Sequence, residues 1–282
     1  MIICKQQIQT SPIKIWQALT EKNQQKEWYF DIPDFELQIG SNFHFYESGE
    51  SKEYLHRCEI LEIIPEKRLS HTWTHPSHSK GSSVLTWDLI PNETGTLVEL
   101  KHDGVETFAD AGPAFSIANF EMGWKNILTM LKLYLNGIKR QTYSIEINAS
   151  SEKVWEQLFS DKGYQSWTSI FTTGSHYKGE IKAGNRIHLL DANGGGMFSD
   201  IIFLIPNKLL IFQHLGELVN FEEQTLDSAT EKWSGSCEIY RLKEESGITK
   251  LNIEVDLAPE YFDFINSKFP LALEKLKENC LV

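Results

Sequence analysis

Cysteine is scarce in this chain, and its few copies form no pattern. The 282 residues include only Cys4, Cys58, Cys237 and Cys280, with no CxxC pair among them. Structural zinc sites and disulfide frameworks need closely or regularly spaced cysteines, so neither is expected. Isolated cysteines among apolar neighbours favour reduced thiols and therefore a cytoplasmic protein.

Long apolar runs and an excess of basic charge are also lacking. No run approaches the roughly 18 apolar residues that a membrane helix needs. The first residues lack the basic and apolar regions of a secretory signal. With 27 basic against 39 acidic side chains, the formal net charge is −12. The sequence therefore predicts neither a membrane span nor a nucleic-acid partner.

Signatures of the common cofactor and catalytic sites are missing as well. The glycine run 194–196 precedes a strand-like segment rather than a helix, so it predicts a hairpin turn instead of a phosphate loop. His71, His75 and His78 have a spacing compatible with metal ligands. However, Pro76 ends that strand, and no carboxylate or cysteine completes a ligand set. We therefore expect no metal and no cofactor.

What the chain does contain is an internal repeat. The tryptophan pairs are each 139 positions apart and the proline pair 141 apart: Trp16 and Trp155, Trp28 and Trp167, Pro65 and Pro206. This period is far longer than that of a solenoid repeat. It predicts two whole domains, 1–137 and 141–282, each of ordinary size.

Each copy has the pattern of an α+β domain. A short alternating strand, clear at 143–147, precedes a helix whose start is marked by Ser11 and Pro12 in the first copy and by Ser150 in the second. Alternating segments and turn signals then predict an antiparallel meander. The strands of the first copy are expected at 43–46, 69–74, 85–89 and 98–102, and one turn at 47–50.

A long amphipathic helix is expected to close each copy. In the first, apolar residues recur at three- and four-residue steps from Ile117 to Leu135, and Gly137 follows as a terminator. In the second, Pro270 predicts a helix that either kinks there or begins there. The acidic stretch 217–231 is expected to be a solvated loop, or else a rim over a cavity.

Two stretches carry a resemblance to a known family. The order of strand, capped helix, meander and long helix resembles the helix-grip arrangement of the START-like superfamily, also called SRPBCC or Bet v-like. Within it, ILEIIPEKRLSHTW at 60–73 and FEMGWKNILTMLKLYL at 120–135 resemble domains similar to the C-terminal part of the activator of heat-shock-protein-90 ATPase. The resemblance implies two tandem helix-grip domains, each an antiparallel sheet wrapped around a long C-terminal helix.

The resemblance also implies a cavity between sheet and helix. Strand parity and position direct several aromatic and histidine side chains of the first domain toward it: Trp28, His71, Trp73, Trp87, His102 and Trp124. The corresponding residues of a second cavity are Trp167, Phe212 and His214. Apolar pockets with a few polar groups are the usual form of small-ligand sites. The alternative is that these side chains simply fill the core.

Three functions are compatible with these features. The first is a non-catalytic, cytoplasmic binding protein for a small apolar or amphipathic molecule, with the site expected in the first domain. The second is a cofactor-independent cyclase or hydrolase that uses His71 or His102 as an acid or base. The third, implied by the resemblance, is a chaperone-associated interaction module.

Overall fold

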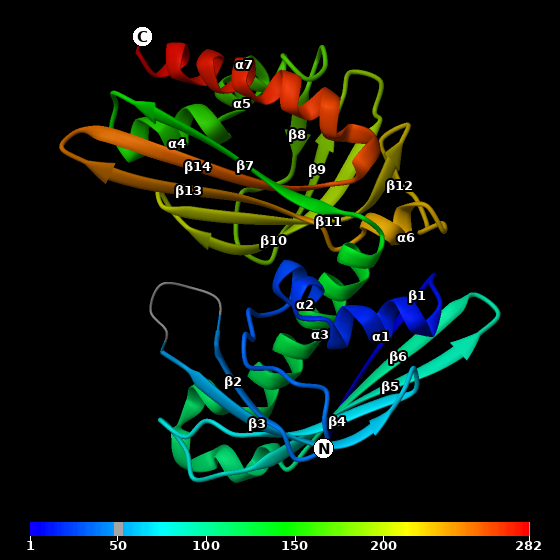
Figure 1. The fold of residues 1–282 in the computed structure, drawn as a ribbon. Coiled ribbons are helices and arrows are strands. Elements are labelled where there is room, and N and C mark those ends of the chain that lie inside the picture. Colours follow the sequence, from blue (N-terminus) through cyan, green and yellow to red (C-terminus); the bar gives the residue numbers. More distant parts are fainter. Residues whose placement is uncertain (48–52, 282) are drawn as a thin grey trace. The chain divides into compact units, whose positions relative to one another are not determined.

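The chain forms two compact units, Met1–Leu135 and Asn136–Val282 (Figure 1). The computed structural model describes residues 1–47 and 53–281. The turn expected at 47–50 falls mainly on residues outside this described part. Within the described ranges, no helix combines the length and apolar character that crossing a membrane requires.

The first unit is a six-stranded antiparallel sheet crossed by one long helix. The strands follow the order β1-β6-β5-β4-β3-β2, so β2 to β6 form a meander and β1 pairs with its last strand. The elements of this unit are β1 (Ile2–Ile8), α1 (Pro12–Thr20), α2 (Lys22–Trp28), β2 (Asn42–Tyr46), β3 (Leu55–Ile64), β4 (Arg68–Trp73), β5 (Ser83–Asn92), β6 (Gly95–Asp103), the 3-10 turns η1 (Val105–Ala111) and η2 (Pro113–Phe115), and α3 (Ile117–Leu135).

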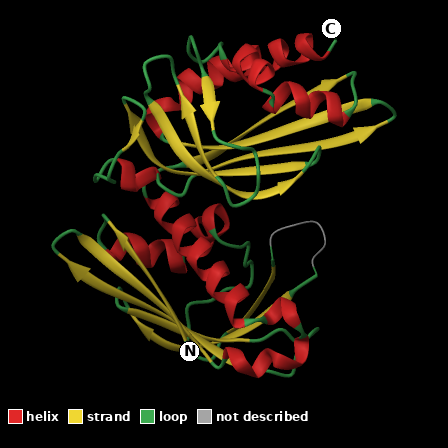
Figure 2. Cartoon of the chain, turned by 180° about the vertical axis from the view of Figure 1, so that it is seen from behind, coloured by secondary structure: helices red, strands yellow, loops and turns green. Residues whose placement is uncertain are grey.

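The second unit repeats this plan with an eight-stranded sheet. Its strand order is β7-β14-β13-β11-β10-β9-β8, with β12 added beside β11. The elements are β7 (Lys139–Ile147), α4 (Ser151–Phe159), α5 (Asp161–Thr168), β8 (His176–Lys178), β9 (Arg186–Leu190), β10 (Gly196–Ile205), β11 (Leu209–Val219), β12 (Glu222–Glu223), α6 (Thr230–Trp233), β13 (Cys237–Glu245), β14 (Ile248–Leu257), the 3-10 turn η3 (Pro259–Tyr261) and α7 (Phe262–Cys280). Figure 2 shows the long helix of each unit against one face of its sheet. The predicted α+β fold of two tandem helix-grip domains is confirmed.

The helix boundaries follow from the residues at the ends. Helix α1 begins at Pro12, and the carbonyl of Ser11 accepts the first helical hydrogen bonds, although the Ser11 hydroxyl makes no cap bond. Ser150 does cap α4, because its Oγ accepts the backbone N–H of Lys153 at 3.3 Å. Gly137 follows α3 with a φ of 77°, in the left-handed region that commonly ends a helix.

The apolar stripe of α3 packs into the core of the first unit. Trp124, Leu128 and Leu131 are buried there among the inward side chains of the sheet. Ile117, which the periodicity places in the same stripe, is instead 55% exposed because it stands at the first position of the helix, beyond these core contacts. The stripe that anchors the helix therefore runs through its middle and C-terminal turns.

Two expectations for the second unit need correction. Helix α7 begins at Phe262 and runs through Pro270, so a start at the proline was wrong. The stretch 217–231 is not a simple loop, because it contains the end of β11, all of β12 and the start of α6. Glu223 of β12 forms an ion pair with Arg186 at 2.8 Å, and this contact helps to hold the hairpin in place.

Candidate functional site

The first unit contains a pocket with a volume of about 340 Å³. It lies between the ends of β3 and β4, the turn η2 and the N-terminal half of α3. The wall is mostly aromatic, with a few polar groups, and comprises Phe30, Glu47, Tyr54, His56, Trp73, His75, Ala114, Phe115, Asn119, Phe120, Gly123, Trp124, Asn126 and Ile127. This combination of apolar area and sparse polar groups is typical of small-ligand sites.

The aromatic rings of the wall pack against one another at their edges. The ring centroids of Trp73 and Trp124 are 5.0 Å apart, with planes inclined at 73°. His56 contacts Trp73 at 4.7 Å, and His75 contacts Phe115 at 4.8 Å. Edge-to-face packing of this kind fixes ring orientation more tightly than apolar contact alone. The side chains of the wall therefore contact one another as a connected set of rings.

Two of the six residues expected to line this cavity do so, namely Trp73 and Trp124. The other four are buried in the core, outside the lining of this pocket: Trp28, His71, Trp87 and His102. Trp28, for example, donates its indole N–H to the carbonyl of Ala18 at 3.0 Å. Its role there is to join α2 to α1.

His102 is held on both ring nitrogens. The indole N–H of Trp124 donates to Nδ1 at 2.9 Å, and Nε2 lies 2.7 Å from Ser83 Oγ. Because an indole nitrogen can only donate, we infer that Nδ1 accepts and that the ring proton is on Nε2. The Ser83 hydroxyl in turn donates a hydrogen bond to the carbonyl of Trp73 at 3.1 Å. Burial lowers the pKa of His102 to about 3. The ring thus serves as a fixed link between sheet and helix.

His71 is also buried and neutral. Its Nδ1 lies 2.9 Å from the carbonyl of Thr72, so Nδ1 carries the proton. Burial lowers its pKa to about 4. The ring packs edge-on against Phe43 at 5.3 Å. Across the described residues, no three side chains of the metal-ligating types come close enough together to hold an ion, the set of His71, His75 and His78 included.

Among the wall residues that sequence reasoning missed are two histidines, His56 and His75. Strand alternation places His75 on the same face as His71 and Trp73, so parity could have identified it. His75 Nε2 accepts the indole N–H of Trp73 at 3.0 Å. Burial lowers the pKa of His75 to about 4 and that of His56 to about 3. Both histidines therefore present neutral rings to the pocket.

The residues expected around a second cavity lie in the core of the second unit. Trp167 and Phe212 both pack against Tyr240, with ring centroids 6.5 and 6.1 Å from the centroid of its ring. His214 Nδ1 lies 2.8 Å from Ser199 Oγ, and its Nε2 is 3.8 Å from Glu238 Oε2. Burial lowers the pKa of His214 to about 4. A buried histidine and a buried serine thus lie next to the aromatic core of this unit.

Glu238 is the charged member of that cluster. Tyr240 donates its hydroxyl to Glu238 Oε1 at 2.5 Å. Burial raises the pKa of Glu238 to about 6, and the hydrogen bond from Tyr240 opposes this rise. Since His214 is neutral near pH 7, the carboxylate gains little Coulomb attraction from it.

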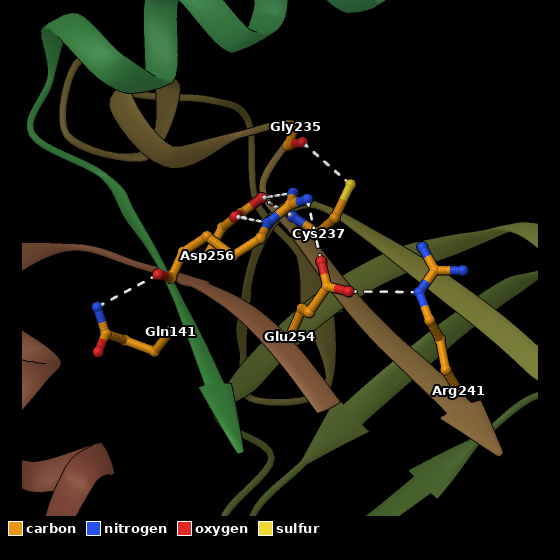
Figure 3. Close-up of polar contacts among 7 residues, drawn as sticks. Gln141, Gly235, Cys237, Arg241, Glu254 and Asp256 are labelled. Carbon is orange, nitrogen blue, oxygen red and sulfur yellow. Dashed lines mark hydrogen bonds and ion pairs between the residues drawn. The ribbon is translucent and has the colours of Figure 1, made fainter. Parts of the chain in front are cut away.

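A separate ion-pair network covers the other face of the same sheet. Figure 3 shows the carboxylates of Glu254 and Asp256 near Cys237 and Arg241. Asp256 accepts two hydrogen bonds from the Arg140 guanidinium, at 2.8 and 3.0 Å, and a third from the backbone N–H of Cys237. Paired contacts of this geometry are among the stronger charge-assisted hydrogen bonds. They tie β7 to β14, which is a structural role.

Comparison with known families gives a match for the first unit. Residues 9–136 match the family model described as "Activator of Hsp90 ATPase homolog 1-like protein". A search of curated proteins gave no match. This match covers less than half of the chain, so it gives the first unit a resemblance to START-like domains. The first unit resembles the Activator of Hsp90 ATPase homolog 1-like family, which confirms the resemblance carried by residues 60–73 and 120–135.

Similar solved structures include both one-unit and two-unit matches. Protein MLL2253 from Mesorhizobium loti is 28% identical and has a TM-score of 0.40, with 46% of this chain and 92% of that one covered. The Aha1 dimer from Colwellia psychrerythraea is 25% identical, with a TM-score of 0.39 and coverage of 49% and 93%. DynU16, from the dynemicin biosynthetic locus, is 13% identical, with a TM-score of 0.41 and coverage of 99% and 96%.

Proposed function

We propose that the first unit binds a small, mostly apolar molecule in the pocket between its sheet and α3, without transforming it. The observation that carries this proposal is the open space of about 340 Å³ with a mostly aromatic lining. Gly123 of α3 is part of the wall, and a Cβ atom added there would meet no atom within 4 Å. Apolar surface left facing such a space is stabilised when a ligand covers it.

The protonation states of the histidines support binding rather than catalysis. A general base works best when its pKa is near the operating pH. Burial lowers the pKa values of His71 and His75 to about 4, and that of His102 to about 3. His102 also has both nitrogens engaged in hydrogen bonds. These rings are poor proton acceptors near pH 7, which disfavours the cyclase or hydrolase alternative.

The experiment that tests this proposal places a large side chain at Gly123 of α3, where it would occupy the pocket. Nile red, a neutral dye that fluoresces in apolar surroundings, is titrated against the wild type, G123F and M122F. Met122 is the adjacent residue, 60% exposed and outside the pocket lining, so M122F is the matched control. We expect G123F to weaken dye binding on the order of tenfold or more, and M122F to leave it unchanged.

Stability distinguishes a filled pocket from a damaged fold. Replacing a glycine inside a helix removes a cost of up to about 1 kcal/mol. A Cβ at Gly123 would also meet no atom within 4 Å, so G123F should unfold no more easily than the wild type. Equal dye binding by the wild type and G123F would contradict the proposal. Loss of binding together with loss of folding in G123F would call for the smaller G123L, which keeps the helix and fills less space.

A chaperone-associated role is a second candidate, favoured by the description of the family matched at 9–136. Purified heat-shock protein 90 offers a direct assay of this role. An increase in its ATPase rate in the presence of the chain would support it, and an unchanged rate at micromolar concentrations would exclude it.

We also propose that the protein works in a reducing compartment, as a cytoplasmic protein does. All four cysteines are free, and Cys4, Cys58 and Cys280 are buried. Burial raises the pKa of Cys280 to about 11, so its thiol stays protonated and unreactive at neutral pH. Fractionation of cells expressing the chain tests this assignment, and recovery from the medium or a membrane fraction would contradict it.

A further inference from the structure

The Trp73–His75 contact determines where the ring proton of His75 lies. The Trp73 indole N–H points to His75 Nε2 at 3.0 Å. An indole nitrogen can donate but not accept, so Nε2 must carry the lone pair. The buried ring is neutral near pH 7 because burial lowers its pKa to about 4. A neutral imidazole has a single N–H, and in His75 that N–H is therefore at Nδ1.

This N–H is left without an acceptor. His75 Nδ1 is buried and has no hydrogen-bond partner among residues 1–47 and 53–281. The ring is surrounded by other rings instead, with Phe115 at 4.8 Å, Phe108 at 5.1 Å and His56 at 4.5 Å. A buried donor without a partner is rare in native proteins and calls for a reason. One such reason is a partner that arrives with a ligand.

In the neighbouring Trp124–His102 pair, both ring nitrogens of the histidine have hydrogen-bond partners. There too an indole N–H is accepted by a histidine, at 2.9 Å. The other nitrogen of His102 is then satisfied by Ser83 Oγ at 2.7 Å. The two pairs differ in their surroundings, because His75 lines the pocket and His102 does not. The incomplete pair is the one whose histidine lines the pocket. Because Nδ1 itself is buried, a ligand oxygen reaches it only when a neighbouring ring moves aside.

We propose that the Nδ1–H of His75 recognises an oxygen acceptor of the ligand, and this inference rests on the proposed binding function. The ligand is then a neutral, largely apolar molecule with a carbonyl, ether or hydroxyl oxygen. A carboxylate fits poorly, since the described wall contains Glu47 but no lysine or arginine. A buried anion without a cationic partner loses its hydration without compensation. His75 therefore selects for ligands that carry an oxygen acceptor, and the aromatic rings supply apolar contact.

The test uses two probes of nearly the same shape, 2-acetylnaphthalene and 2-ethylnaphthalene. Only the first has a carbonyl oxygen. Calorimetry gives the ratio of their dissociation constants for the wild type, H75F, H75Q and H176F. Comparing this ratio between variants cancels the different hydration of the two probes in water. Glutamine keeps one acceptor for Trp73 and one donor for the ligand, and His176 belongs to the second unit and serves as the matched control.

We expect H75F to shift the ratio against the ketone on the order of tenfold, with H75Q and H176F near the wild type. An unchanged ratio in H75F, with both probes bound, would overturn the role of His75 and leave the binding function standing. If neither probe binds the wild type, both proposals fail.

A second readout needs no variant. In nitrogen-15 NMR of the wild type, the ketone should shift the His75 Nδ1–H resonance downfield as the new hydrogen bond forms. The hydrocarbon should shift it much less. Equal shifts with the two probes would contradict the proposal even if H75F failed to fold.

Discussion

Replacing His71 by phenylalanine should make the first unit more resistant to acid. His71 is buried and neutral, and burial lowers its pKa from 6.5 to about 4. In the unfolded chain the imidazole takes up a proton as the pH falls below about 6.5, whereas the folded protein resists that proton until near pH 4. The histidine therefore lowers stability progressively as the pH falls through this window. Phe212 occupies the matching position of the second unit and is fully accommodated there, so phenylalanine is a suitable replacement.

The magnitude follows from the two pKa values. At pH 5 the unfolded imidazole is almost fully protonated and the folded one almost fully neutral, which costs the wild type about 2 kcal/mol. At pH 7 the same difference in protonation lowers the stability of the wild type by only about 0.2 kcal/mol. The H71F substitution should thus raise the free energy of unfolding at pH 5, relative to the wild type, by about 2 kcal/mol more than at pH 7.

Denaturant unfolding at the two pH values is the assay, with hydrogen exchange of β4 and β5 peptides reporting on the first unit alone. H176F serves as the control substitution in the second unit. A pH-independent difference between H71F and the wild type would refute the reasoning, because it would mean that the His71 ring titrates in the folded protein as it does in the unfolded chain.

The remaining predictions concern one buried group in each unit. Burial raises the pKa of Glu238 from 4.5 to about 6, so the folded carboxyl holds its proton more tightly and stability falls as the pH rises through that interval. E238Q should therefore stabilise the second unit by about 2 kcal/mol at pH 7.5 and have little effect at pH 4, as measured by denaturant midpoints. W124F removes the donor to His102 Nδ1 and should cost about 1–3 kcal/mol in thermal unfolding of the first unit. Unchanged stability of W124F would contradict a stabilising hydrogen bond from Trp124 to His102.

Much of the fold could be predicted because its signals are local. The repeated tryptophans, the cap residues Ser11 and Ser150 and the three- and four-residue apolar steps of α3 each depend on a few neighbouring positions. Even so, strand β3 was harder to recognise, because Leu55, His56 and Arg57 lack a clear apolar alternation. This is why His56 was missed as a wall residue.

The pocket itself depends on packing between distant elements. Strand alternation correctly directs Trp73, Trp87 and His102 into the interior. It does not indicate which of these side chains lines the pocket and which packs against other core side chains. That is decided by α3, whose Trp124 contacts Trp73 and donates to His102. The unsatisfied Nδ1–H donor of His75 likewise follows from the hydrogen bond that Trp73 donates to Nε2, and no residue pattern reveals that bond.

The most direct test of the central claim is a nitrogen-15 NMR titration of the wild type with 2-acetylnaphthalene, observed at the tryptophan indole N–H groups. Trp73 and Trp124 line the pocket, whereas Trp28 donates to Ala18 in the core. We predict saturable shifts of the Trp73 and Trp124 resonances with little change at Trp28. Shifts confined to other tryptophans, or none at saturating probe, would contradict a ligand site between the sheet and α3.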